Sequence, residues 1–281
     1  MKKNFQKPAR EKGAVRPKKG LGQNFLAEIG IIEKLVAAAE IAPGQTILEI
    51  GPGTGNLTAK LLETGNPVLA IEKDHEMMDI LKERFAGKAN FNLQNGDALK
   101  FDEAIINGPY KIAANLPFYL TAPLIRKFLE SQNPPLSLTV IVQKEVAQRI
   151  CAKPPKLNLL AISVQFYAKP EIISYVSKGC FWPVPKVDCA ILRIIPETKA
   201  GERGDSEYGA RFFKIMKSGF SHPRKKLGGN LANDLGLDKK TAADWLSANG
   251  IDPGKRAENL SVGDWQNLAR TFPCQKPADK L

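Results

Sequence analysis

Short apolar runs alternate with helical patterns along the chain from residue 42 onward. The apolar runs lie at residues 46–50, 67–71, 89–93, 110–114 and 136–142. The segments 55–65, 75–86, 119–131 and 143–151 have the spacing of apolar residues that is typical of helices. Strands that alternate with helices form a parallel sheet covered by helices, so the pattern predicts an α/β fold.

The pattern changes in the second half of the chain. Runs at 160–167 and 187–195 predict two more strands at the edge of the sheet, and the charged, glycine-containing segment 196–210 predicts a linker. Helical spacing follows at 207–219, 224–235, 239–248 and 261–271, and Ser261 with Asp264 predicts a capped start of the last helix. We therefore expect a basic, disordered arm at 1–19, an α/β domain at 20–199 and a small helical domain at 200–281.

The net charge of +12 is concentrated at the ends of the chain. Residues 1–20 carry eight Lys or Arg and one acidic residue, whereas residues 21–199 are nearly neutral. A basic end is often only a solvated tail, but two basic regions on one chain favour a polyanionic partner. RNA or DNA is the expected partner class.

Cysteine and histidine positions predict neither a zinc site nor a disulfide framework, because Cys151, Cys180, Cys189 and Cys274 lack CxxC spacing and His75 lies far from His222. We expect free thiols in a reducing cytosol and no bound metal. No apolar run reaches the roughly 18 residues of a membrane helix, and residues 1–20 lack the apolar segment of a secretory signal. The sequence thus predicts a cytoplasmic protein without a membrane anchor, with import into an organelle as the less favoured alternative.

A glycine turn at 51–55 follows the first predicted strand and opens a helix. The glycines Gly51 and Gly53 allow close backbone approach to a ligand, although an ordinary turn is the alternative. The GxGxG spacing departs from the GxGxxG of dinucleotide sites, which disfavours a nicotinamide enzyme. Glu72 ends the next strand, at the ~20-residue separation expected of an acid that binds ribose hydroxyls. The glycine turn and Glu72 together therefore predict a nucleoside cofactor.

Two polar positions follow the next predicted strands. Asp97 comes after the third strand, where its carboxylate is placed to accept a hydrogen bond from an adenine amino group. The tetrapeptide Asn115-Leu116-Pro117-Phe118 ends the fourth strand. Ligands of open α/β sheets bind outside the carboxyl ends of the strands, so these positions are expected to meet in one site.

The tetrapeptide at 115–118 suits a flat base that bears an amine. The Asn115 side-chain oxygen and the Leu116 carbonyl can accept the hydrogens of the amine, and Pro117 adds no competing N–H. Phe118 is expected to stack on the base, an interaction worth roughly 1–3 kcal/mol in other nucleic-acid sites. A strand-ending turn with a core phenylalanine is the structural alternative. Together with the cofactor turn, the tetrapeptide indicates methylation of nucleic acid.

With these motifs the chain resembles the ribosomal RNA adenine dimethyltransferases of the KsgA type, over about residues 18–270. The resemblance includes three further segments. Residues 19–26 (KGLGQNFL) are similar to the family's amino-terminal cofactor motif. Residues 181–188 (FWPVPKVD) are similar to its FxPxPKVD loop, and residues 256–261 (RAENLS) are similar to its carboxyl-terminal signature. It implies a class I S-adenosylmethionine-dependent methyltransferase, with a Rossmann-like, mainly parallel seven-stranded sheet and an all-helical C-terminal domain. The implied substrate is two adjacent adenosines near the 3′ end of 16S rRNA in an assembling 30S particle, each methylated twice by a monomeric enzyme during ribosome biogenesis.

The resemblance also implies roles for individual residues. The cofactor, S-adenosyl-L-methionine, is expected to lie among Asn24, Leu26, Gly51, Gly53, Glu72, Asp97 and Asn115. Phe118 and Phe181 are expected to hold the flipped adenine, although Phe181 without the resemblance reads as a core residue. Contacts to RNA phosphates are expected from Lys18, Lys19, Arg224, Lys225 and Lys226.

Two features depart from the family pattern. Phe118 stands where the family commonly has Tyr, which keeps the stacking face and loses a hydroxyl, so activity is expected to survive. The segment 220–231 has an unusual Pro223 and paired glycines, which leaves the details of rRNA docking open.

Three other functions share some of these features. A methyltransferase of large-subunit (23S) rRNA of the macrolide-resistance type has the same asparagine motif, but the signature at 256–261 argues against it. A non-enzymatic RNA-binding assembly factor has no need of Gly51, Glu72, Asp97 and Asn115 together. A DNA adenine methyltransferase shares the amine chemistry, whereas the basic arm and the helical domain favour structured RNA.

Overall fold

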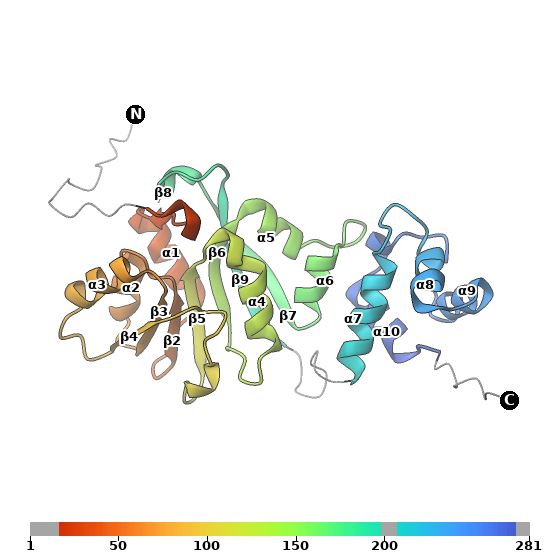
Figure 1. The fold of residues 1–281 in the computed structure, drawn as a ribbon, viewed down its shortest axis with the longest axis horizontal. Coiled ribbons are helices and arrows are strands. Elements are labelled where there is room, and N and C mark those ends of the chain that lie inside the picture. Colours follow the sequence, from red (N-terminus) through yellow and green to blue (C-terminus); the bar gives the residue numbers. More distant parts are fainter. Residues whose placement is uncertain (1–16, 198–206, 274–281) are drawn as a thin grey trace.

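A seven-stranded sheet forms the centre of the computed structural model, which describes residues 17–197 and 207–273 (Figure 1). Its strands are β2 (Thr46–Ile50), β3 (Val68–Glu72), β4 (Phe91–Asn95), β5 (Tyr110–Asn115), β6 (Leu138–Gln143), β7 (Ala168–Val176) and β9 (Cys189–Pro196). The order is β4-β3-β2-β5-β6-β9-β7, and β9 is antiparallel to both of its neighbours while the other pairs are parallel. The predicted mainly parallel α/β sheet is confirmed.

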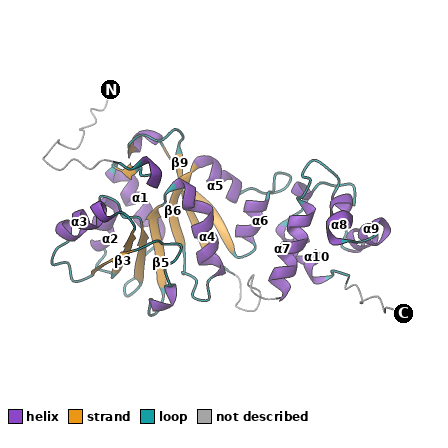
Figure 2. Ribbon diagram, viewed as in Figure 1, coloured by secondary structure: helices purple, strands orange, loops and turns teal. Residues whose placement is uncertain are grey.

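Helices cover both faces of the sheet (Figure 2). They are α1 (Ile29–Ala39), α2 (Asn56–Leu62), α3 (His75–Arg84), α4 (Thr121–Glu130), α5 (Lys144–Ile150) and α6 (Leu159–Gln165). Ile47 of β2 packs in the cluster that contains α1 and α2, whereas Leu48 packs in the cluster of α4, α5 and α6. Successive strand residues point to opposite faces, so an uninterrupted apolar strand can be buried on both sides.

A two-stranded antiparallel sheet lies beside the main sheet. It joins β1 (Phe25–Leu26) to β8 (Phe181–Trp182), with Leu26 opposite Phe181 and Phe25 opposite Trp182. It brings together the amino-terminal motif and the motif at 181–188, which are separated by about 155 residues of chain.

The carboxyl-terminal part is helical, with α7 (Glu207–Gly219), α8 (Leu227–Leu235), α9 (Lys239–Ala248) and α10 (Val262–Arg270). The four predicted helices are confirmed, and α7 and α9 have the predicted bounds. Ser261 caps α10 as expected: its Oγ accepts a hydrogen bond from the Asp264 N–H at 3.2 Å, and Asp264 Oδ2 accepts one from the Ser261 N–H at 2.8 Å.

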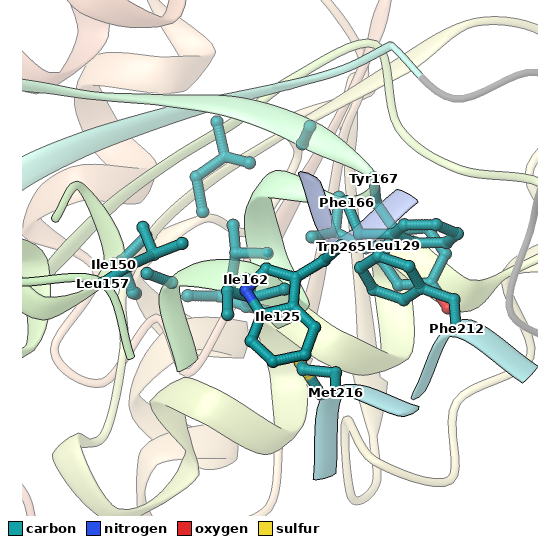
Figure 3. Packing of buried hydrophobic residues seen from close by; sticks show 14 of the residues in the cluster. Ile125, Leu129, Ile150, Leu157, Ile162, Phe166, Tyr167, Phe212, Met216 and Trp265 are labelled. Carbon is teal, nitrogen blue, oxygen red and sulfur yellow. The ribbon is translucent and has the colours of Figure 1, made fainter. Parts of the chain in front are cut away.

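The helical part and the α/β part share one hydrophobic core. Phe212 of α7 stacks on Phe166, which follows α6, with ring centroids 4.1 Å apart and an interplanar angle of 25°. Figure 3 shows Phe212 and Met216 of α7 and Trp265 of α10 in the same cluster as residues of α4 and α6. Because apolar contacts run without a break between the two parts, the helical part is packed against the sheet domain rather than only tethered to it.

One predicted strand, 160–167, is wrong, because this segment forms the helix α6. Asn158 caps the helix through its Oδ1, which accepts a hydrogen bond from the Ala161 N–H at 3.1 Å. The apolar run packs in the core cluster beside α4 and α5, so a short buried helix satisfies both the cap and the burial.

Among the longer elements, the pattern also missed α1 and β7. The start of α1 has no side-chain cap at Glu28, and β7 contains Pro170, which normally argues against a strand. β7 lies at the edge of the sheet, where the missing N–H of proline is tolerated. Most of the arm at 1–19 and of the linker at 196–210 lies outside the described residues, so the domain boundaries stay predictions.

Candidate active site

A pocket opens at the carboxyl edge of the sheet, where β2, β3 and β5 end and β4 passes into the turn at Asp97. It is lined by ten of the residues that the sequence assigns to the site: Asn24, Leu26, Gly51, Gly53, Glu72, Asp97, Asn115, Leu116, Pro117 and Phe118. The parallel register explains the convergence, because Ile50 lies opposite Ile71 and Glu72 lies opposite Asn95. Strand ends that are distant in sequence are thus adjacent in space.

Two positions of the glycine turn accept no residue larger than glycine. Gly53 has φ 56°, and a Cβ there would lie 2.8 Å from the Phe25 ring. Gly55 has φ 82°, and a Cβ there would lie 2.7 Å from Phe85. Both the left-handed backbone and the close ring contacts require glycine. At Gly51 and Gly53 the turn therefore presents main chain without a side chain to the pocket.

Glu72 is held by three backbone N–H groups. Its Oε1 accepts hydrogen bonds from Lys73 at 2.9 Å and Asp74 at 2.8 Å, and its Oε2 accepts one from Gly53 at 3.1 Å. Burial raises the pKa of Glu72, and these hydrogen bonds act in the opposite direction. A carboxylate has about four lone-pair sites, so this arrangement leaves capacity for a ligand hydroxyl.

Asp97 is fixed and ionised. Its Oδ2 lies 2.9 Å from Lys73 Nζ, and its Oδ1 accepts a hydrogen bond from the Leu99 N–H at 3.0 Å. The hydrogen bond from Lys73 holds the pKa of Asp97 below its usual range. An ionised carboxylate only accepts hydrogen bonds, which is the property needed to bind an exocyclic amine.

Asn115 has a defined orientation. Its Nδ2 donates a hydrogen bond to the Asn24 carbonyl at 2.8 Å, and its Oδ1 has no protein partner within residues 17–197 and 207–273. The amide therefore turns its donor toward the amino-terminal motif and keeps its acceptor for a ligand. Phe118 is half-buried on the adjacent wall of the pocket.

The amino-terminal motif is fastened over the pocket by Asp74. Lys18 Nζ lies 2.5 Å from Asp74 Oδ1, and Gln23 Nε2 donates a hydrogen bond to Asp74 Oδ2 at 2.8 Å. Lys18 is thus engaged in an ion pair within the protein, although we predicted it as an RNA contact. The side chain of Lys19 lies outside the described residues.

Phe181 does not line the pocket in this structure. Its side chain is 2% exposed and packs in the hydrophobic cluster that also contains Leu26. The adjacent Trp182 is 40% exposed and stacks on Phe25, which does line the pocket. Phe181 therefore lies outside the lining of the pocket, and its role in holding the target base stays a prediction.

The three predicted basic residues of the helical part, Arg224, Lys225 and Lys226, line a separate hollow together with His222 and Arg256. All three are exposed, and no ion pair joins them to an acid in the described parts of the chain. Lys225 is held through its backbone, whose N–H donates to the His222 carbonyl at 2.9 Å. The hollow concentrates positive charge next to the start of α8.

Sequence reasoning missed several residues of the pocket, including Glu49, Lys73 and Tyr119. Only Glu49 gives a clear signal in the sequence, since it is an acid inside the otherwise apolar strand β2. It lines the pocket and is 1% exposed, and its Oε2 has no hydrogen-bond partner in the described structure. Burial, together with the nearby charge of Glu72, raises the pKa of Glu49 to about 8.

The raised pKa makes a testable contribution to stability. Between about pH 4.5 and 8 the folded state keeps the Glu49 proton that the unfolded chain loses, so folding becomes less favourable as the pH rises. Glu49→Gln removes this dependence. Relative to the parent protein, the variant is expected to gain about 1.4 kcal/mol of unfolding free energy per pH unit across this window, measured by urea denaturation.

The matched control for this titration is Glu33→Gln, because the Glu33 side chain is 59% exposed. Its difference from the parent is expected to stay nearly constant with pH. If the Glu49→Gln difference is equally flat from pH 5 to 8, the carboxyl is ionised in the folded protein and the assignment is wrong.

No group of His, Cys, Asp and Glu side chains suited to a metal ion occurs within residues 17–197 and 207–273. In the same ranges, no helix combines the length and the apolar character needed to cross a bilayer.

Comparison with known proteins agrees with this geometry. The model of the family described as Ribosomal RNA adenine dimethylase matches residues 15–273. The chain is 44% identical to Ribosomal RNA small subunit methyltransferase A of Dehalococcoides mccartyi (strain CBDB1), over 92% of this chain and 91% of the relative. It is 36% identical to the protein of the same name from Moorella thermoacetica, over 94% of both chains.

Two solved structures share the fold over most of their length. A dimethyladenosine transferase from Plasmodium falciparum superposes with a TM-score of 0.73 at 28% identity, covering 86% of this chain and 95% of the other. The 23S rRNA methyltransferase ErmE superposes with a TM-score of 0.72 at 23% identity, covering 88% and 99%, and supports the fold alone.

The sheet, the glycine turn and the carboxylates at the strand ends define a class I methyltransferase that uses S-adenosylmethionine. The chain belongs to the ribosomal RNA adenine dimethylase family. It is accordingly an rRNA adenine dimethyltransferase, as the resemblance in its motifs predicted.

Proposed function

We propose that this enzyme methylates the N6 amines of two adjacent adenosines near the 3′ end of small-subunit (16S) rRNA, giving N6,N6-dimethyladenosines. The single observation that carries the proposal is the pocket that joins Glu72, Asp97 and the free acceptor of Asn115 at one edge of the sheet. The relatives named Ribosomal RNA small subunit methyltransferase A support the choice of subunit.

The residues of the pocket fit S-adenosylmethionine. Glu72 has hydrogen-bonding capacity left for ribose hydroxyls, and ionised Asp97 suits the adenine amine. Gly51 and Gly53 offer main chain without side chains, and Asn24 and Leu26 close the pocket from the amino-terminal motif. When bound, this cofactor supplies a methyl group on a positively charged sulfur.

The target amine is a weak nucleophile because its lone pair is delocalised into the ring, so its orientation decides the rate. We assign the Asn115 Oδ1 and the Leu116 carbonyl as acceptors for the amine hydrogens, which hold the lone pair toward the methyl donor. Pro117 adds no donor, and Phe118 stacks on the flipped base. The ring of Phe181 is buried, so a contact with the base requires the neighbouring chain to move.

The RNA is proposed to approach the face that carries both the pocket and the basic hollow. In Figure 1 the loop between α7 and α8, which contains Arg224, Lys225 and Lys226, lies on the same side as α5 and β8 near the carboxyl edge of the sheet. We further propose that the enzyme acts as a monomer on an assembling 30S particle in the cytoplasm, since the substrate is a part of that particle.

The basic hollow makes a prediction for RNA binding. Replacing Arg224, Lys225 and Lys226 together by Gln is expected to weaken rRNA binding and to reduce the slope of log K against log salt by about 2 units, because each phosphate contact contributes somewhat less than one. Filter binding at 50 and 200 mM salt measures the slope.

A triple Gln variant at Lys214, Lys239 and Lys240 removes the same charge from other exposed positions of the helical part. It is expected to leave the slope nearly unchanged. An equal reduction in both variants would assign the effect to net charge rather than to the hollow.

The proposed function is tested by transfer of tritiated methyl groups from S-adenosylmethionine to small subunits prepared without the modification, with mass spectrometry of the digested RNA. Dimethyladenosine near the 3′ end supports the proposal. Methylation of large-subunit rRNA instead, mapped by primer extension, or cofactor binding without methylated RNA would overturn it.

A further inference from the structure

A second hollow lies beside the active site, beyond the carboxyl ends of β6 and β7. The expectations drawn from the sequence assign no function to it, and its lining combines lysines with polar and apolar side chains: Lys144, Glu145, Gln148, Lys178, Lys186, Val187 and Asp188. These residues come from α5, the turn after β7 and the loop after β8. Three segments distant in sequence thus build one surface.

Asp188 fixes the geometry of this hollow. Its carbonyl accepts a hydrogen bond from the Lys144 N–H at 2.9 Å, and its Oδ1 accepts one from the Lys178 N–H at 3.0 Å. Both hydrogen bonds use backbone N–H donors, so the ammonium groups of the two lysines take no part in them. The loop is fastened to α5 and to the turn after β7, while the lysine side chains remain available.

The three lysines of the hollow outnumber the two acids in its lining, Glu145 and Asp188. Lys144, Lys178 and Lys186 are exposed, and no ion pair joins any of them to an acid in the portion of the chain that the structure describes. Lys144 Nζ instead lies over the Tyr175 ring, 5.1 Å from its centroid. Unpaired ammonium groups around a hollow are suited to phosphate oxygens.

Two large aromatic rings are exposed on the chain segments that carry Lys178 and Lys186. Tyr175 is 54% exposed at the edge of the hollow, where Gln148 donates a hydrogen bond to its hydroxyl at 3.5 Å. Trp182 is 40% exposed and is held flat by Phe25, with centroids 6.2 Å apart and an angle of 23°. Exposed rings interleaved with lysines are the combination that binds single-stranded nucleic acid.

This surface adjoins the pocket in which the target base is held. Phe25, which supports Trp182, lines the pocket itself. On the sheet, Asn115 lies opposite Ile141, and Lys144 is only three residues beyond Ile141. A nucleotide next to a base bound at Asn115 therefore reaches Trp182 and the lysines within a short span of RNA backbone.

We propose that Lys144, Tyr175, Lys178, Trp182 and Lys186 form a flanking-RNA surface, which binds the single-stranded rRNA nucleotides adjacent to the target adenosines. Bases stack on the two rings, and the backbone phosphates meet the lysines. The proposal rests on the proposed function, because it assumes an RNA substrate at Asn115. It adds a second place where the enzyme holds the strand and sets which adenosine enters the pocket.

Two variants test the surface separately. The first replaces Lys144, Lys178 and Lys186 by Gln, and the salt slope of binding to a single-stranded RNA of the target sequence is expected to fall by about 2 units. The second is Trp182→Ala, for which the KM for that RNA is expected to rise about tenfold or more. Trp182→Phe keeps a stacking face and is expected to recover most of the loss.

Each measurement is paired with the affinity for S-adenosylmethionine, which is expected to be unchanged. A triple Gln variant at Lys34, Lys82 and Lys88 supplies the matched control, because these exposed lysines lie on α1, on α3 and after α3. If the two triple variants behave alike, the proposal is overturned.

The outcomes also separate this surface from the proposed function. If the unaltered enzyme fails to methylate small-subunit rRNA, the proposed function fails. If it methylates the rRNA and the variants bind free RNA normally but bind the assembled particle weakly, the surface contacts a ribosomal protein and the flanking-RNA proposal is wrong.

Discussion

Asn115→Ala is expected to lower the rate of methyl transfer by at least about 100-fold at saturating cofactor, because the amine then loses the acceptor that orients it. The side chain donates to the Asn24 carbonyl in the free enzyme, so a modest loss of cofactor affinity is also expected. Single-turnover transfer of tritiated methyl to rRNA separates the two effects, since raising the cofactor concentration restores binding but not orientation.

Asn92→Ala is the matched control for this experiment, because Asn92 is exposed on β4. It is expected to transfer methyl groups at the parental rate. A rate for Asn115→Ala within a few-fold of the parent at saturating cofactor would refute the assignment of Asn115 as the acceptor.

Phe212→Ala is expected to lower the free energy of unfolding by about 3–5 kcal/mol, which is typical for removing a buried phenylalanine. The side chain is fully buried and stacks on Phe166, at the junction of the helical part and the sheet domain (Figure 3). Its removal leaves a cavity at the place where the two parts meet. Urea denaturation followed by circular dichroism measures the loss.

Lys214→Ala provides the control on the same helix, because Lys214 is exposed on α7. Its effect is expected to be within about 0.5 kcal/mol. A loss below 1 kcal/mol for Phe212→Ala would mean that the junction closes around the smaller side chain, or that the two parts do not depend on each other for stability.

The sequence predicted the elements whose pattern admits only one interpretation. The run at 46–50 is apolar, is followed by a glycine turn and forms β2 with those bounds. The amphipathic spacing at 207–219 and 239–248 likewise corresponds to α7 and α9. Residues 160–167 are apolar without a decisive period, so burial alone did not separate strand from helix, and the cap at Asn158 favoured the helix.

In the active site, the sequence predicted the positions that the sheet topology sets and missed the contacts that side chains make. Residues at the ends of parallel strands were predicted to converge because topology dictates it, and eight of them line one pocket. Contacts that depend on side-chain reach were not predicted: the ion pair of Lys73 with Asp97, and the bonds of Asp74 to Lys18 and Gln23. Nothing in the spacing of these residues specifies that their side chains meet.

The continuous core between the sheet domain and the helical part has a consequence for genetics. Trp265 of α10 lines neither the active-site pocket nor either of the two hollows, yet it is 1% exposed in the same cluster as Leu124 and Ile162. Substitutions there reduce the amount of folded enzyme rather than its chemistry. A screen for cells that lack the rRNA modification will therefore recover α10 variants that regain activity when grown at lower temperature, whereas variants at Asn115 will stay inactive at every temperature.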